Sequence, residues 1–592
     1  MKRIMPVLLI SLLIANIVWA QSTLEPGPAA KNQAPASMQN QVPATQLDLA
    51  SATIADLDAA FGKGTLTAEK LTALYLARIA AYDKQGPAIN AVITLNPNAL
   101  AEARTLDAER KAGKVRGPLH GVPIVLKDNY DTFDLPTTAG SHLLAGSVPP
   151  KDAFVVKKLR DAGAVILAKV NLSEFAAGGG SVIGATDPAI LKAGTIANGF
   201  SSMGGQTLNP HDLARGPGDS SGGTGAAIAA AFAQFGLGTD TAGSIRGPSA
   251  ANGIVGLKTT LGLISRTGIV PLASFDTSGP MARSVYDVAV VLGVMVGADP
   301  ADASTRESAG KAQADYTKFL KAGSLKGARI GIGRDFSGSD PETIRITDES
   351  IATLKKLGAV IVDPVRYPDY LLQIKQPLFT LIRNSEFKAR IADYLKTLKP
   401  GYPRTLDELI AKASDPKTGY RSPEKLVGLK YTASVALDLN DPVYLAAKNE
   451  GVAALKSSLQ AVFAKDHLDA IIYPTANRPA ALIKPAAAPA GDAAGAVAGG
   501  AATVAARGGQ SSALFADESG SPEIIVPAGM TRGGLPVTIS FFGQPYTEPK
   551  LLGYAYDFEQ ATHARVLPKN TPALPADTIP LSSRPGRVIN LR

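Results

Sequence analysis

Short apolar segments alternate with helical segments along this chain, and this alternation most constrains its fold. Residues 122–126 and 164–171 have the composition of buried strands, and residues 152–163 between them have a helical pattern. Residues 328–335 and 470–476 are two further strand candidates. Strands that alternate with helices favour an α/β fold, in which helices cover a sheet.

The composition supports a large buried core and limits the chemistry that is available. Of the 592 residues, 45% are hydrophobic and 58 are glycine, which favours close backbone packing and tight turns. The net charge is +9, but the Lys and Arg residues do not form clusters interleaved with aromatic residues. No nucleic-acid partner is therefore predicted. The chain has no cysteine, which excludes disulfides, cysteine nucleophiles and thiolate metal ligands.

The first twenty residues have the organisation of a secretory signal peptide. Lys2 and Arg3 give a positive start, residues 4–19 are mostly apolar, and Ala20 is a small residue at the expected cleavage site. The apolar run is short for a membrane span, which needs about 20 residues, so an uncleaved anchor is the less favoured alternative. We therefore expect a bacterial protein that is periplasmic or secreted, without stable membrane insertion after cleavage.

Composition also divides the rest of the chain. A disordered linker rich in Pro, Ala and Gln is predicted over residues 21–47, and the main domain over residues 48–575. Within that domain, residues 310–460 are more helical and more charged, and we expect them to form an outer lobe. Residues 484–512 are an Ala/Gly-rich segment that predicts a flexible loop, and residues 576–592 are interpreted as a tail.

Two serine-containing segments are candidates for a nucleophile. Residues 218–222 read GDSSG, which fits the G-x-S-x-G nucleophile elbow, but loop precedes them instead of an apolar strand. Ser244 lies within residues 238–253, GTDTAGSIRGPSAANG, which contain no histidine. A histidine-dependent triad is not favoured in either segment, because the chain has only five histidines and none has a suitable context.

A lysine can serve as the base instead of histidine if it is buried, because loss of solvent disfavours the charged ammonium and lowers its pKa. Lys127 is the candidate, since it ends the apolar segment GVPIVLK. The alternative, a strand-end lysine that reaches solvent, stays open on this local pattern.

Residues 218–249, GDSSGGTGAAIAAAFAQFGLGTDTAGSIRGPS, resemble the Gly/Ser-rich signature of the amidase signature family. The match fails at one constrained position, Asp219, where the family has a small residue. Segments including PLHGVPIVLKDN, AKVNLSEF and GGQTLNP extend the resemblance over about residues 50–570. Four segments, with the export signal, look most like bacterial peptide amidases: GGQTLNP, GIVGLKTTLGLISRTGIVPL, SFDTSGPMARSV and LPVTISFFGQPYTEPKLLGYAYDFEQAT. The resemblance implies a large twisted mixed β-sheet covered by helices on both faces.

The resemblance also implies a Ser-Ser-Lys triad. Ser244, the serine before I-R-x-P, would be the nucleophile. Ser220, the first of the serine pair, would be the bridging serine and would follow a cis peptide bond. Lys127, in the pattern G-x-P-x-x-x-K-D, would be the base. Neutral Lys127 would take a proton from Ser220 as Ser220 takes one from Ser244, and water would hydrolyse the resulting acyl-serine.

Further groups would support this reaction. In the family, the negative oxygen of the tetrahedral intermediate is bound by backbone N–H groups of the nucleophile turn, which here belong to Thr241, Ala242, Gly243 and Ser244. Asp240 and Arg246 are interpreted as a buried ion pair that holds this turn. Ser221 is interpreted as a donor within the serine loop that orients Lys127 or Ser220.

The predicted activity is hydrolysis of a carboxamide C–N bond. Peptide C-terminal amides are the first candidate substrates, and small aliphatic or aryl-acyl amides are the alternatives. No cofactor is predicted, and Asp128, Asp131 and Asp134 lack the spacing of metal ligands, so no metal is predicted either. A non-catalytic binding protein, disabled by Asp219 beside Ser220, is the alternative of another class. The amidotransferase component that makes Gln-tRNA shares the signature, but the export signal argues against it.

Overall fold

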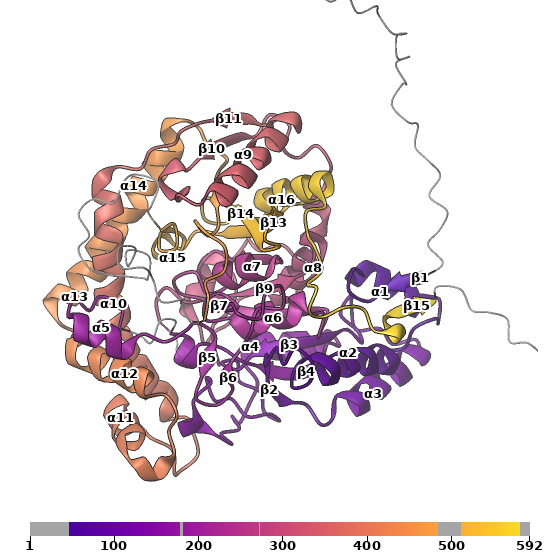
Figure 1. Cartoon of the computed structure of the whole chain (residues 1–592), viewed down its shortest axis with the longest axis horizontal. Coiled ribbons are helices and arrows are strands. Elements are labelled where there is room, and N and C mark those ends of the chain that lie inside the picture. Colours follow the sequence, from indigo (N-terminus) through magenta and orange to yellow (C-terminus); the bar gives the residue numbers. More distant parts are fainter. Residues whose placement is uncertain (1–45, 178–181, 271–272, 484–510, 581–592) are drawn as a thin grey trace, which may run out of the picture. The chain divides into compact units, whose positions relative to one another are not determined.

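A mixed sheet of eleven strands forms the centre of the described structure (Figure 1). The structure is a computed structural model, and it describes residues 46–177, 182–270, 273–483 and 511–580. In spatial order the strands are β11 (Val360–Val362), β10 (Arg329–Ile332), β12 (Ala470–Pro474), β14 (Pro536–Phe542), β13 (Glu523–Met530), β8 (Val255–Lys258), β9 (Thr277–Ala282), β7 (Phe235–Asp240), β3 (Pro123–Lys127), β4 (Val165–Val170) and β2 (Val92–Leu95).

Two groups of parallel strands flank an antiparallel centre. Strands β11, β10 and β12 are parallel in one group, and β7, β3 and β4 in the other. The strands between them pair antiparallel, as does the edge strand β2. All four segments predicted as strands form strands, namely β3, β4, β10 and β12. The predicted α/β fold with a large mixed sheet is therefore confirmed.

Helices pack against this sheet along its length. Helices α2 and α3 contact β4, α6 contacts β3 and β7, α8 contacts β9, and α16 contacts β13. The Thr67 side chain caps the N-terminus of α2 by accepting from the backbone N–H of Lys70. The helices of this part of the fold are α1 (Ile54–Gly62), α2 (Ala68–Tyr82), α3 (Ala99–Lys111), α4 (Phe154–Asp161), α6 (Gly222–Ala229), α7 (Arg246–Asn252), α8 (Val285–Met295), α9 (Pro341–Lys356), α15 (Phe515–Ser519) and α16 (Glu548–Thr562).

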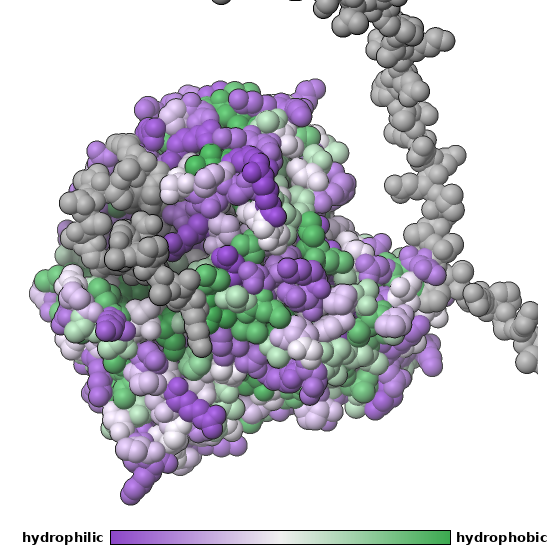
Figure 2. Space-filling model, viewed as in Figure 1, coloured by the Kyte–Doolittle hydropathy of each residue, from purple (hydrophilic) through white to green (hydrophobic). Residues whose placement is uncertain are grey.

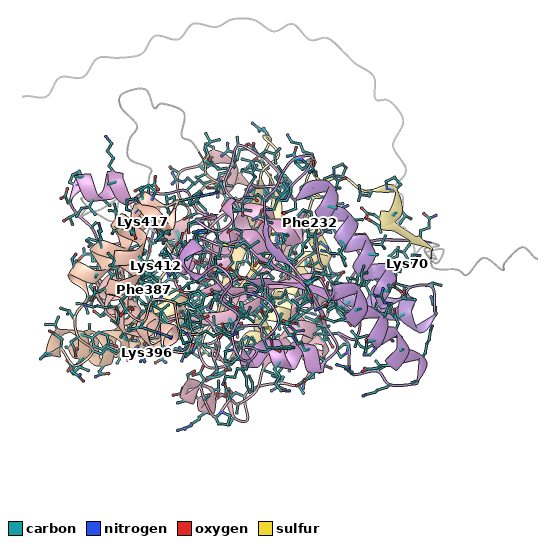
Figure 3. All side chains as sticks on the ribbon, turned by 90° about the horizontal axis from the view of Figure 1, so that it is seen from below. Lys70, Phe232, Phe387, Lys396, Lys412 and Lys417 are labelled. Atoms are coloured by element: carbon teal, nitrogen blue, oxygen red, sulfur yellow. The ribbon has the colours of Figure 1, made fainter. Side chains whose placement is uncertain are left out.

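A second group of helices, here called the helical lobe, lies beside the sheet (Figure 1). Figure 3 places Phe387 and Lys412 among these helices and Phe232 in the part that holds the sheet. The lobe does not take up all of residues 310–460, because β10, α9 and β11 in that range belong to the sheet region. Its helices are α5 (Pro188–Gly194), α10 (Asp369–Leu395), α11 (Leu406–Ser414), α12 (Pro423–Val435), α13 (Pro442–Ala446) and α14 (Val452–Lys465).

The two ends of the described chain pair with each other. Strand β1 (Gln46–Asp48) pairs antiparallel with β15 (Thr578–Pro580). The guanidinium of Arg78 forms an ion pair with Asp577 beside this pair and is only 1% exposed. The end of the predicted linker and the start of the predicted tail are therefore part of the folded domain, because each supplies main-chain hydrogen bonds to the other.

Several predicted segments lie outside the described residues. These are the signal peptide 1–20, the linker up to residue 45, the loop residues 484–510 and the tail after residue 580. Within the described ranges, no helix combines the length and the apolar character needed to cross a membrane.

Candidate active site

Lys127 is the last residue of β3, and its side chain is completely buried. Its Nζ lies 2.8 Å from Ser220 Oγ and 2.9 Å from Ser221 Oγ. A third hydroxyl, Thr239 Oγ1, lies 2.8 Å from the same nitrogen. The alternative of a strand-end lysine in solvent is therefore wrong.

The environment of Lys127 favours a neutral amine. Burial lowers the pKa of the Lys127 amine to about 7, although the carboxylates of Asp219, Asp240 and Asp276 oppose this shift by attracting the charged form. An unperturbed lysine has a pKa above 10 and would be almost wholly protonated at neutral pH. A substantial share of the Lys127 side chains is therefore neutral near pH 7 and able to accept a proton.

Small residues in α6 and β7 allow the close packing around Lys127. A Cβ atom on Gly223, in the first turn of α6, would lie 2.2 Å from the backbone oxygen of Asn171. A Cβ atom on Gly236 in β7 would lie 2.6 Å from Thr224 Cγ2. Both distances are far inside van der Waals contact, so only glycine fits at these positions.

Ser244 lies in the turn between β7 and α7. Gly243 before it has φ +107°, in the left-handed region that favours glycine. The backbone N–H of Ser221 donates to the carbonyl oxygen of Ser244 at 3.2 Å, which ties the serine loop to this turn. Ser244 is 4% exposed, and no residue of the described chain forms a hydrogen bond with its hydroxyl. Figure 2 shows that hydrophobic and hydrophilic residues are mixed over the visible face of the molecule.

The structure brings Lys127 and Ser220 together but does not join the hydroxyls of Ser220 and Ser244 by a hydrogen bond. The cis peptide bond expected at Ser220 is absent as well. Among the described residues, the cis peptide bond joins Asp363 to Pro364. A cis bond before a residue other than proline costs about 3 kcal/mol, so the trans form is favoured wherever the surroundings do not enforce cis.

The predicted set of oxyanion donors needs a correction at Gly243. Its backbone N–H donates to Asp240 Oδ1 at 2.7 Å and therefore cannot also bind the substrate oxygen. Within the described part of the chain, no acceptor is bound to the backbone N–H groups of Thr241, Ala242 and Ser244. These three groups remain as candidate donors.

A buried network of charges holds the nucleophile turn. Asp240 Oδ1 lies 3.0 Å from the Arg246 guanidinium, and its Oδ2 accepts from the backbone N–H of Ile245 at 2.8 Å. Burial disfavours ionisation of Asp240, but Arg246 and the backbone donors hold its pKa well below the usual range. Arg246 also forms ion pairs with Glu523, at 2.8 Å, and with Asp517.

Sequence reasoning found the Asp240–Arg246 pair but missed three of the residues around the site. Thr239 stands at the end of β7 within the matched signature, and its position five residues before Ser244 was the available signal. Asp517 and Glu523 are more than 250 residues from Arg246 in sequence, and no local pattern connects them to it.

Asp219 lies beside the nucleophile turn. Its Oδ2 is 3.8 Å from the position that a Cβ atom would take on Gly243, and with Ala242 it lines a cavity of about 110 Å³. Burial and the negative charge of Asp240 raise the pKa of Asp219 to about 6, while the attraction of Lys127 opposes this shift. At neutral pH the Asp219 carboxylate is mostly ionised and favours the protonated form of Lys127.

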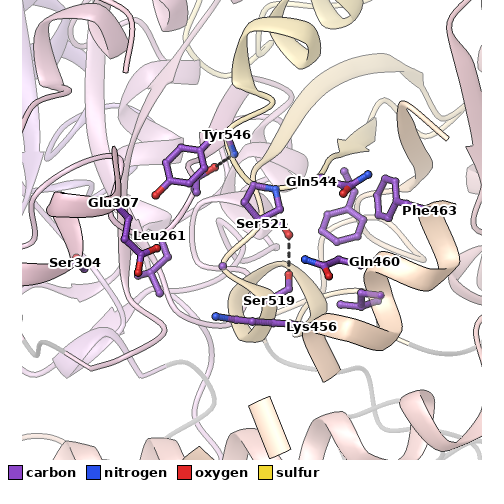
Figure 4. A pocket seen from close by; sticks show the side chains of 15 residues that line it. Leu261, Ser304, Glu307, Lys456, Gln460, Phe463, Ser519, Ser521, Gln544 and Tyr546 are labelled. Carbon is purple, nitrogen blue, oxygen red and sulfur yellow. Dashed lines mark hydrogen bonds between the residues drawn. The ribbon is translucent and has the colours of Figure 1, made fainter. Parts of the chain in front are cut away.

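A larger cavity, of about 220 Å³, lies away from these residues (Figure 4). Lys456 of α14 and Tyr546 lie on its walls, and Ser519 Oγ donates to Ser521 Oγ at 2.9 Å on another wall. None of the candidate catalytic residues lines this cavity.

Comparison with known proteins agrees with this geometry. A sequence model of the family described as Amidase matches residues 70–552. A probable amidase of Arabidopsis thaliana is 33% identical over 87% of this chain and 91% of its own length. A component of the glutamyl-tRNA(Gln) amidotransferase of Moorella thermoacetica is 34% identical over 86% of this chain and 96% of its own. The crystal structure of native peptide amidase from Stenotrophomonas maltophilia is 38% identical, with a TM-score of 0.74, over 88% of this chain and 98% of that chain.

Proposed function

Because the chain belongs to the amidase family and is a hydrolase of carbon–nitrogen bonds, we propose that it cleaves carboxamides through an acyl-serine intermediate on Ser244. Lys127, Ser220 and Ser244 form the catalytic set of this proposal. The observation that carries it is the fully buried Lys127 amine, whose Nζ lies 2.8 Å from Ser220 Oγ. In this position a fraction of the Lys127 amines is neutral and can act as a base. The Ser220 hydroxyl beside the amine can relay the proton.

The reaction begins with proton transfer along the three residues. Neutral Lys127 accepts the Ser220 proton while Ser220 accepts the proton of Ser244, and Ser244 Oγ forms a bond to the amide carbon. The contact between the two serine hydroxyls forms when substrate binds, because catalytic hydrogen bonds are often completed only in the substrate complex. The backbone N–H groups of Thr241, Ala242 and Ser244 bind the negative oxygen of the tetrahedral intermediate.

The relay then reverses. Protonated Lys127 returns its proton through Ser220 to the amide nitrogen, the C–N bond breaks, and ammonia leaves a primary amide. Water, activated by the same lysine and serine, attacks the ester carbon of acyl-Ser244. The products are a carboxylic acid and the regenerated serine.

The proposed substrates are peptide C-terminal amides, and small aliphatic or aryl-acyl amides are the alternatives. The likeness to solved peptide amidase structures at 38% identity supports the first choice. We also propose export to the periplasm or the medium, on the basis of the basic and apolar segment that ends at Ala20.

The test combines active-site labelling with ammonia release from peptide amides, free amides and anilides. A fluorophosphonate probe should label Ser244 in the protein without its signal segment, and Lys127→Ala should lose both labelling and turnover. Ser220→Ala should lose most of the turnover while the protein stays folded. Full activity of Ser244→Ala would contradict the proposal.

A second candidate function is that of the amide-hydrolysing component of an amidotransferase. The 34% identity to a component of glutamyl-tRNA(Gln) amidotransferase favours it. Such a component would need partner proteins for its full activity, whereas the proposed amidase is active alone. Rapid ammonia release from a peptide amide by the purified chain would exclude this candidate.

A further inference from the structure

Four arginine side chains of the described chain are buried, and they differ in what their guanidinium groups contact. Arg78, Arg246 and Arg283 each donate to several carbonyl, carboxylate or other oxygen acceptors. Arg383 of α10 is 7% exposed and donates a single hydrogen bond, from Nη1 to Asn384 Oδ1 at 2.8 Å. Among the described residues, Arg383 therefore leaves more of its donors without a partner than the other three arginines do.

A buried guanidinium without an anion is costly, because the charge has lost its hydration and gained no partner. Burial lowers the pKa of Arg383 to about 10, against the attraction of Asp276, so the side chain stays charged at neutral pH. No carboxylate of the described residues lies within ion-pair distance of it. A buried guanidinium with unused donors can take up an anion that a ligand supplies.

The unpaired donors of Arg383 are not fully enclosed by the described residues. The Nε of Arg283 is sealed from solvent without a partner, but no nitrogen of Arg383 is sealed in that way. The Arg383 guanidinium carbon lies 5.1 Å from the centre of the Phe387 ring, which supports its flat face. One edge of the Arg383 guanidinium therefore donates to Asn384, and one face packs on the Phe387 ring. Its other edge forms no hydrogen bond with the described residues.

Packing contacts connect the helix that carries Arg383 to the nucleophile turn. Phe379, one helical turn before it, stacks on Phe275 with ring centres 5.7 Å apart. Asp276, the next residue after Phe275, accepts a hydrogen bond from the side chain of Thr241 in the nucleophile turn. Ala242 of that turn packs against the apolar cluster that contains both phenylalanines. The face of α10 that carries Arg383 therefore adjoins the nucleophile turn.

The carboxylates nearest to this face have other partners. Glu386 forms an ion pair with Lys448 at 3.1 Å and accepts from Tyr444 Oη at 2.8 Å. Glu174 accepts from Tyr420 Oη at 2.7 Å, and its charge acts on Lys425, whose pKa is lowered to about 7 by burial and by the charge of Arg383. Among the described residues, Asp276 is near enough to attract Arg383, but no carboxylate forms an ion pair with it.

We propose that Arg383 binds a carboxylate on the acyl part of the substrate, so that the preferred substrates are amides that also carry an acidic group. This inference rests on the proposed function. The planar fork of a guanidinium matches a carboxylate with two parallel hydrogen bonds, which is why arginine suits this task. The carboxylate must belong to the acyl part, because the other product of a primary amide is ammonia.

The test compares acidic amides with neutral isosteres. The first set is the monoamides of succinic, glutaric and adipic acid, each against its diamide. The second set is the N-acetyl α-amides of aspartate and glutamate, against those of asparagine and glutamine. For the substrate whose chain is long enough to bring its carboxylate to Arg383, kcat/KM should be roughly 10- to 100-fold higher than for its neutral isostere. This is the range expected for hydrogen bonds to a charged group. The preference should lie mainly in KM, because it is a binding contact away from the reacting carbon.

Variants assign the preference to the side chain. Arg383→Met should abolish it and leave turnover of the neutral amides within a few-fold of the wild type. Arg383→Lys keeps the charge and should retain part of the preference, and it carries the test if the methionine variant does not fold. Arg390→Met is the matched control, because Arg390 lies on the same helix, is 46% exposed and pairs with Asp393. That control should keep the full preference.

Two results would overturn the assignment of Arg383. One is equal kcat/KM for acid and isostere at every length in the wild type. The other is an equal decrease of kcat/KM for the acidic substrate and its neutral isostere in Arg383→Met, which would indicate a structural role. Failure of the proposed function gives a different result, since no member of either set would then release ammonia.

Discussion

At the scale of single residues, the contacts of Lys127 explain how a lysine can be the base. A neutral amine has two N–H donors and one lone pair. Ser221 Oγ donates to the Thr239 carbonyl oxygen at 3.1 Å, so it is placed to accept from Lys127. Thr239 Oγ1 can accept the second N–H at 2.8 Å, which leaves the lone pair for the proton of Ser220. These contacts hold the amine in position whether it is neutral or charged.

The first prediction concerns pH. Only the deprotonated form of Lys127 is a base, and its pKa is about 7, so kcat/KM should fall as pH decreases below about 7. The rate constant should drop close to tenfold per pH unit on the acid side and level off above pH 8. The measurement is kcat/KM for one peptide amide between pH 5 and pH 9. A flat profile over that range would contradict the assignment of Lys127 as the base.

The second prediction concerns Asp219. Its carboxylate attracts the charged Lys127 and so raises the pKa of the lysine amine. Asp219→Ser should lower that pKa and move the acid side of the kcat/KM profile to lower pH. Asp212→Ser is the control, because Asp212 is in the preceding loop, is 39% exposed and pairs with Arg215. A profile that stays in place for Asp219→Ser, or moves to higher pH, would show that this carboxylate does not act on Lys127.

The sequence predicted that Lys127 and Ser220 would lie together, and the structure places Lys127 Nζ 2.8 Å from Ser220 Oγ; the catalytic role of the set remains the proposal. The set of oxyanion donors could not be predicted from sequence. The backbone N–H of Gly243 donates to Asp240, and this hydrogen bond depends on the conformation of the turn. The sequence around Lys127 did not show whether its side chain is buried. In the structure it is buried, because helices α2 and α6 and strands β4 and β7 pack around β3.

At the scale of elements, the predicted strands share a physical feature. Strands β3, β4, β10 and β12 each have a parallel neighbour, and parallel strands covered on both faces appear as unbroken apolar runs. Strands β7 and β9 were missed, because their sequences FGLGTD and TSGPMA are rich in glycine and small residues that have low strand propensity. Tertiary packing against α6 and the neighbouring strands makes them strands.

The third prediction concerns the charge network that joins β7, α7, β13 and α15. Arg246→Met would leave three buried carboxylates without their cation. It should lower the free energy of unfolding by about 3–5 kcal/mol, measured by urea denaturation. Arg334→Met is the matched control, because Arg334 also pairs with two carboxylates but is 29% exposed, and it should cost less than about 1 kcal/mol. Equal losses in the two variants would contradict the account of the network.

The fourth prediction concerns the fit of α6 against the strand end of β4. Gly223→Ala places a methyl group 2.2 Å from the backbone oxygen of Asn171 and must displace the helix that follows Ser220. It should destabilise the protein by about 1–3 kcal/mol and reduce kcat strongly. In the control, Gly62→Ala, the methyl group meets no atom within 4 Å, and stability and kcat should be almost unchanged. Wild-type kcat in Gly223→Ala would show that this contact does not position the serine loop.

At the scale of the whole molecule, segments distant in sequence close the fold and build the site. β1 and β15 are separated by more than 500 residues and pair with each other. Their short sequences, QLD and TIP, carry no signal that would place them in a domain instead of in a linker and a tail. The candidate site likewise takes Lys127 from β3, Ser220 from the loop before α6 and Ser244 from the turn after β7. Two acidic partners of Arg246 come from residues 517 and 523.

The central claim is that Ser244 becomes acylated with Lys127 as the base, and the direct measurement is the position of the acyl group. The protein is mixed with an ester or amide substrate at pH 8 and quenched in acid within milliseconds. It is then digested, and its peptides are analysed by mass spectrometry. The account predicts the acyl mass on the peptide that contains Ser244, and none in Lys127→Met. An acyl group on another residue, or turnover with no acylated peptide at any time, would contradict it.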